Sequence, residues 1–454
     1  MDDNNDIDDL ITRAQAAYRE DAIDRAIALF SNAVERAPEN LEVCLGLGES
    51  LVRAGHFEDA TDYLERADQA RPNDAHLLDL LGYTYGQTGR FQSAETCFRK
   101  LVRMRGGDAQ TLCNLGSVLN ELGRFDEAER MFKTCLRRDR ENKLGRYNLG
   151  LLQLLQGDFL HGWEGFELRA EVSGYEKKSF PNMAAWQGEN IRGRTILLYA
   201  EQGLGDTIQF ARYASVLAQR GARVIIQCEH ALARLLETIE GVDEVVAALD
   251  SGHGADYYAS LLSLPMLCKT TPTEIPGPSP YISASGAMPA AANIRARRVA
   301  GKRRVGLVWA GNPDHKQDRK RSLHLGQLIA VLGRDDLEVY SLQIGAAAAQ
   351  IAELTDAVRP ISVFDDVRPL DDVASALKNL DLLISVDTSL AHLAGALAVP
   401  VWTLVSYFPD WRWMLDRSDT PWYPSMRLFR QPKPNDWAGA IGEVMAALNA
   451  PGVR

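Results

Sequence analysis

Two glycines and an aspartate stand between an apolar run and an amphipathic run near the middle of this 454-residue chain. The segment reads EQGLGDTIQF (residues 201–210) and follows TILLYA. Gly203 and Gly205 permit a tight turn and a close backbone approach. Asp206 falls at or next to a predicted helix start, where it either caps the helix or, facing a cleft, takes a proton from an attacking hydroxyl. The dinucleotide fingerprint fails at Ile208, which disfavours a nicotinamide or flavin enzyme.

A second group of candidate residues lies in WAGNPDHKQDRKRSLHLGQL, residues 309–328, which also follows a predicted strand. Its cations and polar donors are concentrated in an otherwise acidic protein. A local cationic loop beyond a strand end suits a pyrophosphate, and the alternative is an ordinary solvated loop. The residues concerned are Asn312, His315, Lys316, Arg319, Lys320, Arg321 and Ser322.

A third group opens the segment ISVDTSLAHLAGALAVPVW, residues 384–402. Asp387, Thr388 and Ser389 stand where a strand gives way to a helix, whose free N–H groups and dipole favour an anion. Asp387 either caps that helix or holds a ribose hydroxyl, and Thr388 and Ser389 are alternatively ordinary capping residues. His392, on the first turn, is alternatively a core histidine. If both this group and the basic loop face one cleft, a nucleotide diphosphate is the expected ligand.

Short apolar runs alternate with amphipathic stretches throughout the second half of the chain. This alternation predicts parallel sheets of Rossmann type, which bind ligands beyond the carboxyl ends of their strands. A Pro-rich stretch at 269–292 separates two such sets and suggests a cleft between them. The expected strands are 195–200, 223–228, 304–310, 338–344, 381–386 and 401–405, and the expected helices are 206–219, 231–239, 346–358, 372–380 and 389–397.

The first third of the chain repeats itself every 34 residues, as the glycines at 48, 82, 116 and 150 show. Each glycine follows a leucine, and an alanine and a large apolar residue recur in the same register. Such a unit cannot bury its apolar face alone, so the units are expected to stack into a solenoid that binds an extended peptide or a partner helix. Residues 171–192 lose the helical period and are expected to link the solenoid to the second half.

Composition excludes several other classes of function. The net charge of −11 argues against binding to nucleic acid or to an anionic membrane surface. The acidic start MDDNNDIDDL is unlike a signal peptide, and no apolar run is long enough for a membrane span. Six cysteines without CxxC pairs indicate reduced thiols in a cytoplasmic protein, and no cluster has the spacing of a metal site.

Four segments together resemble a known family. AEQGLGDTIQFARYA, RKRSL, SVDTSLAHLAGALAVPVW and PDWRWMLDRSDTPWYPSMRLFRQ resemble bacterial tetratricopeptide-repeat glycosyltransferases. Their catalytic part looks like the heptosyltransferase-like branch of the GT-B glycosyltransferases, and the layout is similar to O-linked N-acetylglucosamine transferase. The resemblance implies an α-solenoid at residues 1–170, followed by two Rossmann-like α/β domains of the GT-B fold at 171–300 and 301–454.

The resemblance also implies roles for single residues. Asp206 matches the acid that faces the acceptor, and Lys316 or a basic neighbour matches the phosphate-binding loop. Gln343 sits where such enzymes contact the nucleoside. The aromatic residues of the last matched segment either line the cleft or pack between the two halves: Trp411, Trp413, Trp422 and Tyr423. The motif that holds the donor diphosphate is matched by Asp387, Thr388, Ser389 and His392.

The expected function is glycosyl transfer from a nucleotide sugar to a protein hydroxyl, without a metal or other cofactor. The repeats would hold the acceptor, flagellin being one acceptor class of the family, and the resemblance implies inversion at the sugar. Two alternatives remain open at this point. One is a non-catalytic repeat adaptor with a relict transferase part, and the other is a transferase acting on a lipid or glycan, with the repeats used for assembly. The solenoid could also pair two copies through its first, capping unit.

Overall fold

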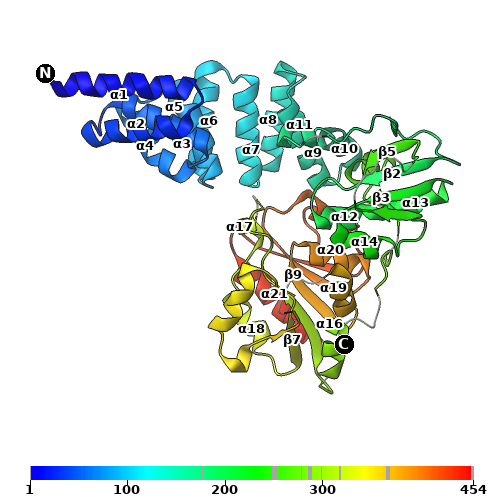
Figure 1. Ribbon diagram of the computed structural model, residues 1–454. Helices are drawn as coiled ribbons and strands as arrows, with labels where there is room; N and C mark the ends of the chain where they lie inside the picture. The colour runs from blue at the N-terminus through cyan, green and yellow to red at the C-terminus, as the bar shows by residue number, and fades with distance from the viewer. Residues whose placement is uncertain are drawn as a thin grey trace. The chain divides into compact units, whose positions relative to one another are not determined.

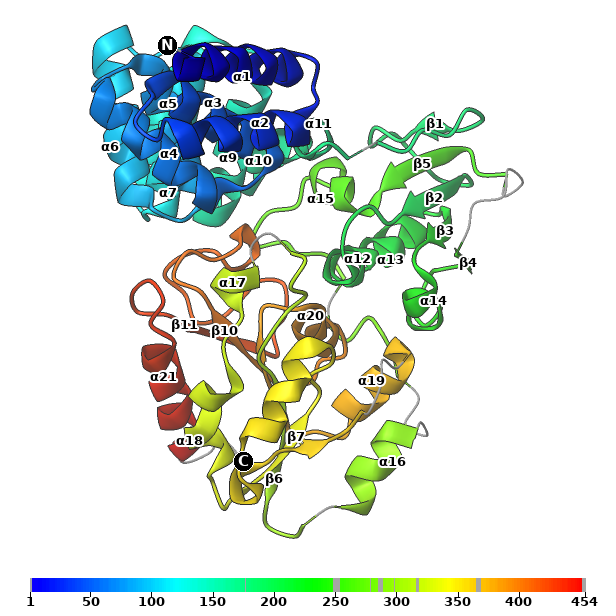
Figure 2. The same ribbon diagram turned by 60° about the vertical axis from the view of Figure 1, so that its left-hand side comes forward.

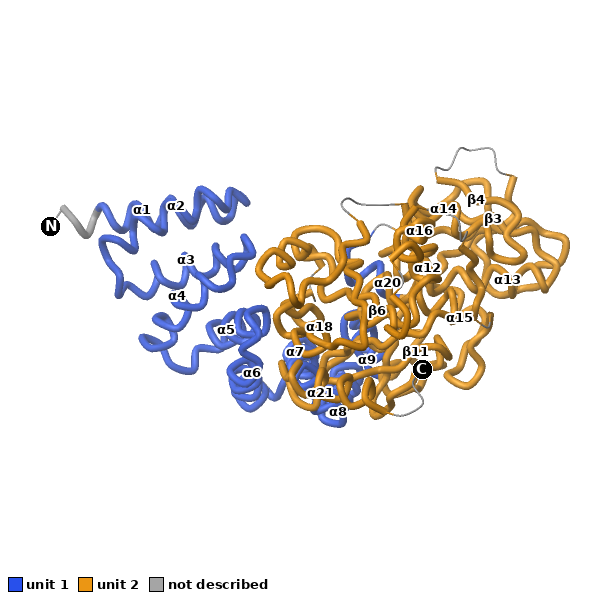
Figure 3. The backbone as a smooth tube through the Cα atoms, turned by 90° about the horizontal axis from the view of Figure 1, so that it is seen from below, with its two compact units in different colours: residues 1–152, 168–175 blue, residues 153–167, 176–454 orange. Residues whose placement is uncertain are grey.

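The computed structural model describes residues 2–175, 177–247, 254–277, 279–284, 289–297, 299–315, 318–364 and 369–450. The chain divides into two compact units, which Figure 3 shows in blue and orange. Unit 1 consists of residues 1–152 and 168–175, and unit 2 of residues 153–167 and 176–454. Helix α9 (Lys143–Gln156) runs from the first unit into the second.

Unit 1 is a stack of helix pairs, visible at the blue end of the chain in Figures 1 and 2. First helices α1, α3, α5 and α7 contact one another in order, whereas second helices contact mainly the first helices beside them. Besides α9, its helices are α1 (Asp2–Arg19), α2 (Ile23–Arg36), α3 (Leu41–Ala54), α4 (Phe57–Ala70), α5 (Ala75–Gln87), α6 (Phe91–Arg105), α7 (Ala109–Glu121), α8 (Phe125–Arg138) and α11 (Arg169–Ser173).

The repeated glycines are explained by the packing within each pair. A Cβ atom on Gly48 would lie 2.6 Å from Leu64 Cδ2, and one on Gly82 would lie 2.8 Å from Phe98 Cε1. Any side chain at these positions would push the second helix away from the first. The recurring alanines on the second helices are completely buried. The prediction of a repeat solenoid is confirmed.

Unit 2 contains two parallel sheets. The first has the strand order β1-β5-β2-β3-β4, and all its pairs are parallel. Its strands are β1 (Ala184–Ala185), β2 (Thr195–Tyr199), β3 (Arg223–Gln227), β4 (Glu244–Val246) and β5 (Tyr257–Ser260). The associated helices are α10 (Phe159–Phe166), α12 (Leu204–Ala211), α13 (Tyr213–Gln219), α14 (His230–Leu236), η1 (Leu261–Ser263) and α15 (Leu264–Leu267). We call residues 177–284 the first lobe.

The second sheet has the order β11-β10-β9-β6-β7-β8 and is also entirely parallel. Its strands are β6 (Arg303–Val308), β7 (Leu337–Ser341), β8 (Ile361–Ser362), β9 (Leu382–Val386), β10 (Val401–Val405) and β11 (Met426–Arg430). Its helices are α16 (Pro289–Ala296), α17 (Asp318–Arg321), η2 (Leu325–Leu328), α18 (Ile329–Leu332), η3 (Ala346–Glu353), η4 (Asp356–Val358), α19 (Leu370–Leu377), α20 (Ser389–Ala396), η5 (Trp411–Trp413) and α21 (Trp437–Asn449). We call residues 289–450 the second lobe.

Helices cover both faces of the second sheet, with α18 and α21 on one side and α16 and α19 on the other (Figure 2). The core between α21, η2 and the central strands is apolar and almost completely buried. Strands that are buried on both faces have continuous apolar sequences, and for this reason the central strands of this sheet could be predicted. The expected α/β character is confirmed for both lobes.

Each sheet has a point where the chain reverses the direction in which it adds strands. In the first sheet this point lies between β2 and β5, and in the second it lies between β6 and β9. Loops on either side of such a point diverge and leave a crevice at the carboxyl ends of the strands, where open parallel sheets bind ligands. The loops after β2, β6 and β9 carry most of the residues that the sequence singles out.

Some expected elements differ in the structure. The helix expected over 346–358 is instead two 3-10 segments, η3 and η4. The sequence did not indicate β1, β4, β5, β8 or β11, nor helices α15 to α18 and α21. Helix α10 lies within the residues 1–170 expected for the solenoid, and the structure groups it with unit 2. None of the helices that the structure describes combines the length and the apolar content needed to cross a bilayer.

Candidate functional site

The loop after β2 brings the first lobe against the second. Helix α12 contacts α20, and a Cβ atom on Gly205 would lie 3.0 Å from His392 Cδ2 and 3.5 Å from Ser389 Cα. The close approach predicted for Gly205 is therefore present, and its partner is a protein helix. Gly203 has φ −71° and ψ 167°, an extended conformation open to any residue, so its glycine character is not required by the backbone.

Asp206 lies in the first turn of α12, three residues after the capping position. Its Oδ2 accepts a hydrogen bond from the Gly203 N–H at 3.0 Å, so the carboxylate stabilises the start of the helix. Its Oδ1 forms an ion pair with Arg412 Nη2 at 2.5 Å. The structure therefore contains the capping role, and the carboxylate also faces the second lobe.

Arg412 is the main residue of this site that sequence reasoning missed. Arg412 is 8% exposed, and its guanidinium also donates to Asp410 Oδ1 at 2.9 Å and to Gln209 Oε1 at 2.7 Å. The guanidinium lies over the Trp411 ring, with its Cζ 4.4 Å from the ring centroid. The segment PDWRW held a signal, because a cation flanked by two tryptophans is suited to burial against aromatic rings.

Burial dominates the electrostatics around Arg412. Desolvation raises the pKa of Asp206, opposed by the charge of Arg412. Desolvation also raises the pKa of Asp387 to about 6, helped by the negative charge of Asp410. The neighbouring carboxylates raise the pKa of Arg412, so this side chain remains a cation. Two carboxylates, Asp206 and Asp410, thus pair with the buried Arg412 guanidinium, and Asp387 acts on it through its charge. The pKa values of Asp206 and Asp387 are both raised above that of an ordinary aspartate.

The start of α20 has the open amide donors that the sequence predicted. Thr388 is the capping residue, yet its side chain makes no capping bond; its Oγ1 lies 3.1 Å from Ser385 Oγ instead. Within the described part of the chain, no acceptor is recorded for the backbone N–H of Ser389 or Leu390. These two donors and the positive end of the helix dipole suit an anionic group.

His392 is placed differently from the expected donor contact. Its Nδ1 lies 2.9 Å from Tyr423 Oη, and its ring stacks on Trp413 with centroids 5.3 Å apart. Desolvation holds its pKa well below the usual value, so the ring is neutral. Its Nε2 lies 3.9 Å from Asp387 Oδ1. We therefore assign His392 to the contact between the lobes, beside Asp387, and not to a cationic phosphate site.

The basic loop is braced largely by its own side chains. Ser322 Oγ accepts from the Gly311 N–H at 2.9 Å and donates to Asp318 Oδ1 at 2.9 Å, which makes it a structural residue. Arg321 Nε lies 3.4 Å from the same carboxylate, and the Arg321 charge lowers the pKa of Asp387 across the site. Asn312 is exposed and its Oδ1 accepts from the Asp314 N–H.

Lys316, the expected phosphate contact, lies outside the described residues. Among the described residues of this loop, Arg321 and Asn312 are the two that can contribute to the site.

Gln343 is also largely occupied by the protein. Its Oε1 accepts from the Trp309 and Ala310 N–H groups at 3.0 and 2.9 Å, and its Nε2 donates to two carbonyls. The side chain fixes the loop after β6, so direct reading of a base by its amide is not what the structure shows. Gln343 nevertheless lines a cavity of about 440 Å³ beyond β7 and β8, together with Arg359, Ser362 and Phe364.

The aromatic cluster packs the two lobes together and does not line an open cleft. Trp411, Trp413, Trp422 and Tyr423 are all at most 5% exposed. Trp411 stacks on Phe210 of the first lobe, with ring centroids 6.5 Å apart. Arg212 of the first lobe is also buried here and donates to the Trp422 carbonyl at 2.9 Å. Of the two interpretations, packing is the correct one. Within the described residues, no group of three or more metal-ligating side chains is present.

Comparison with known proteins identifies the repeats. Models described as tetratricopeptide repeat match residues 17–83, 75–108 and 109–146. Protein FlbA of Caulobacter vibrioides is 25% identical over 313 residues, which cover 63% of this chain and 52% of FlbA. The chain thus spans about half the length of that curated relative.

Solved structures with repeats are also similar to part of the chain. A structure of MamA from residue 41 to its end, from Desulfovibrio magneticus RS-1, is 15% identical, with a TM-score of 0.34, and the match covers 38% of this chain and 97% of that chain. YrrB, described as a TPR protein with an unusual peptide-binding site, is 20% identical, with a TM-score of 0.32, over 36% of this chain and 85% of YrrB. Both matches cover little more than a third of this chain.

Proposed function

We propose that unit 2 is a GT-B-like glycosyltransferase that moves a sugar from a nucleoside diphosphate to a hydroxyl of a protein acceptor. The observation that carries the proposal is the meeting of α12 and α20. This contact joins the helix that carries Asp206, after β2 of one parallel sheet, to the helix that begins at Ser389, after β9 of the other: a Cβ atom on Gly205 would lie 3.5 Å from Ser389 Cα. A base and an anion site at two facing sheet edges are the two groups that glycosyl transfer requires.

The donor diphosphate would lie at the start of α20, with Arg321 supplying positive charge. Asn312 and the cavity beside Gln343 would receive the nucleoside end. No metal or other cofactor enters the scheme, because helix donors and fixed guanidinium groups neutralise the leaving group.

In the reaction, the acceptor oxygen forms a bond to the anomeric carbon while the bond from that carbon to the phosphate oxygen breaks. The hydroxyl proton passes to Asp206, and the electron pair leaves with the nucleoside diphosphate. A single displacement of this kind inverts the anomeric centre. Arg412 must then exchange part of its contact with Asp206 for the arriving phosphate, which frees the Asp206 Oδ1 lone pairs to accept the proton.

The acceptor is assigned to a protein because the same chain carries tetratricopeptide repeats, which bind polypeptides in other proteins. The resemblance noted above includes flagellin among the acceptors of such enzymes, and we propose a flagellin-type hydroxyl as the first substrate to test.

A second candidate function is supported by one observation. Both carboxylate oxygens of Asp206 are already engaged, one by Gly203 and one by Arg412. In a relict transferase without catalytic activity, these two structural contacts would be the whole role of Asp206. In that case the chain is an adaptor, and the α20 start is an unused helix end.

A nucleotide panel separates the two functions. Uridine, guanosine, adenosine and cytidine diphosphates are added to the full chain while its unfolding temperature is recorded. A transferase is stabilised by one of them in proportion to the logarithm of its concentration. The nucleotide that binds is then supplied as its sugar conjugate with a candidate flagellin, and intact mass reports the transfer. An unfolding temperature that none of the four nucleotides changes would contradict the transferase and support the adaptor function.

A further inference from the structure

The negative charge of the protein is concentrated in its first repeats. Residues 1–100 contain 20 acidic and 10 basic side chains, whereas residues 101–454 contain 41 and 40. The net charge of −11 is therefore almost entirely a property of helices α1 to α6. A partner that approaches this part of unit 1 meets a negative potential, which favours a basic partner and disfavours nucleic acid.

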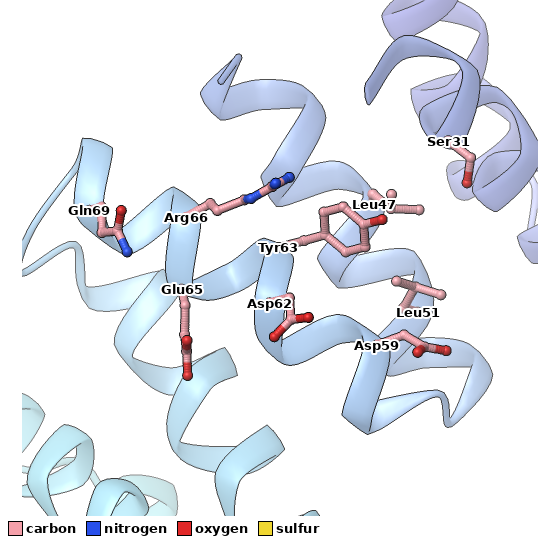
Figure 4. A pocket seen from close by; sticks show the side chains of 9 residues that line it. All are labelled: Ser31, Leu47, Leu51, Asp59, Asp62, Tyr63, Glu65, Arg66 and Gln69. Carbon is pink, nitrogen blue, oxygen red and sulfur yellow. The ribbon is translucent and has the colours of Figure 1, made fainter. Parts of the chain in front are cut away.

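The same region contains a cavity of about 530 Å³, lined by nine residues of α2, α3 and α4 (Figure 4). Its walls come from the second helices α2 and α4, and the two residues of α3 that line it are buried. Leu47 and Leu51 of α3 contribute its apolar part, and Ser31 of α2 its far wall. The remaining residues belong to α4 and are Asp59, Asp62, Tyr63, Glu65, Arg66 and Gln69.

Four of the α4 residues follow helical spacing and form one stripe. Asp59, Asp62, Tyr63 and Arg66 are related by i, i+3, i+4 and i+7, so they share a face of the helix. Figure 4 shows Tyr63 directed toward Leu47, with the two aspartates to one side and Arg66 to the other. Glu65 is turned to the next repeat, where it pairs with Arg90.

This stripe is not part of the repeat scaffold. The register of 34 residues places serine, threonine, cysteine and lysine at the equivalent positions of α6, which are Ser93, Thr96, Cys97 and Lys100. The scaffold needs the buried glycine and alanine positions and leaves this face free to differ. No ion pair is recorded for Asp59 or Asp62 anywhere in the described chain, whereas Arg66 lies 5.8 Å from the Tyr63 ring centroid.

We propose that this cavity, which we call the α4 notch, binds a lysine or arginine side chain from a basic segment of a partner protein. The aliphatic part of that side chain would lie on Leu47, Leu51 and the Tyr63 ring, and its charged end would meet Asp59 and Asp62. The notch lies on the second-helix layer of the solenoid and takes no part in sugar transfer. Binding of a basic side chain there can therefore be tested separately from the proposed function.

The test uses the full chain and a short fluorescein-labelled peptide of alternating lysine and alanine, with its glutamate counterpart. Fluorescence anisotropy gives both dissociation constants at low and at physiological salt. We expect the lysine peptide to bind to the full chain and the glutamate peptide not to bind. The double variant D59N/D62N weakens the lysine peptide by about fivefold to tenfold, because two cation–carboxylate contacts are lost.

The matched control is E20Q/D24N, which removes the same charge from two exposed side chains of the first repeat that do not line the notch. It leaves the dissociation constant within about twofold, and circular dichroism shows both double variants folded. Equal weakening by the two double variants would overturn the proposal, since the peptide would then respond only to net charge. Failure of the lysine peptide to bind, or self-association that D59N/D62N abolishes, would overturn it as well.

Discussion

Asp206 is the residue on which the proposed chemistry depends, and its two contacts limit what it can do. In the structure it is a helix-stabilising carboxylate and one arm of an ion pair. Asparagine is the substitution that disturbs these contacts least. Its single amide oxygen can still accept a hydrogen bond from either Arg412 or Gly203, whereas its NH2 group can accept neither that bond nor a proton.

We expect Asp206→Asn to lower turnover about 100-fold or more while the dissociation constant of the bound nucleotide changes less than about threefold. The reason is that asparagine cannot accept the acceptor proton. Release of nucleoside diphosphate measures turnover, and calorimetry measures binding. Asp108→Asn is the control, because Asp108 also caps a helix start, that of α7 in unit 1. Turnover that survives in Asp206→Asn would reduce Asp206 to a helix cap.

The pKa of Asp387 leads to a prediction about stability. Burial raises this pKa from 3.8 to about 6 in the folded protein. Between these values the unfolded chain has released its proton while the folded protein still holds it. The free energy of unfolding therefore falls as the pH rises through this window.

Asp387→Asn lacks this titration. Relative to the parent, the variant should gain up to about 3 kcal/mol in free energy of unfolding between about pH 4 and about pH 7. Urea unfolding followed by tryptophan fluorescence measures it, and all eight tryptophans lie in unit 2, so the signal reports that unit. If the free energies of unfolding of the parent and the variant changed with pH in the same way, the folded state would not raise the pKa of Asp387.

At the scale of elements, the contact between α12 and α20 fixes the site. Gly205 permits it, because a side chain there would meet His392. Gly205→Ala should lower the free energy of unfolding of unit 2 by about 1–3 kcal/mol, since the crowded helices must separate. The measurement is again urea unfolding by tryptophan fluorescence.

Gly442→Ala is the matched control for this substitution. Gly442 lies in α21 with no neighbour within 4 Å of the added Cβ, so alanine should stabilise the helix by about 0.5–1 kcal/mol. Opposite signs for the two glycine-to-alanine variants are the expected result. A neutral Gly205→Ala would mean that α12 and α20 are not held at this distance.

The elements that sequence reasoning found were those with strong periodic signals. The buried central strands of both sheets and the 34-residue repeat were predicted because each depends on a pattern of apolar residues. The missed strands are short or lie at or near the sheet edges, where side chains are partly exposed and the apolar run is broken; they are β1, β4, β5, β8 and β11. The 346–358 segment is rich in alanine, which suggested an α-helix, yet it folds as 3-10 turns after Gly345, which has φ 73°.

The candidate site was predictable to the same extent. Asp206, Asp387 and Ser389 were found because they follow strands at the carboxyl edge of a parallel sheet. Arg412 was missed because its partners Asp206 and Gln209 lie about 200 residues away, at separations of 206 and 203. Ser322 and Gln343 hydrogen-bond to backbone groups of the loop after β6. This could not be predicted from residue type, since the same side chains can hydrogen-bond equally well to a ligand.

At the scale of the whole molecule, the chain combines a repeat unit with a two-sheet unit, and each unit carries its own candidate site. The repeat unit carries most of the negative charge and the α4 notch. The two-sheet unit carries the carboxylates and the open helix start. In the function that we propose, the first unit binds the protein acceptor and the second unit transfers the sugar.

The central claim is that a donor diphosphate binds the open amides of α20, and Ser389→Pro tests it most directly. Ser389 is the first residue of this helix, where proline is tolerated, and the extended Thr388 before it is compatible with proline. The substitution therefore removes one amide donor without removing the helix. Ser389→Ala is the control, because it removes the hydroxyl and keeps the amide.

Calorimetric titration of the parent and both variants with the nucleoside diphosphate selected by the panel gives the answer. We expect Ser389→Pro to weaken binding about tenfold and Ser389→Ala less than about threefold, with unfolding temperatures that show both variants folded. Binding by Ser389→Pro that equals binding by the parent would contradict the account, because the anion would then not be held by the start of α20.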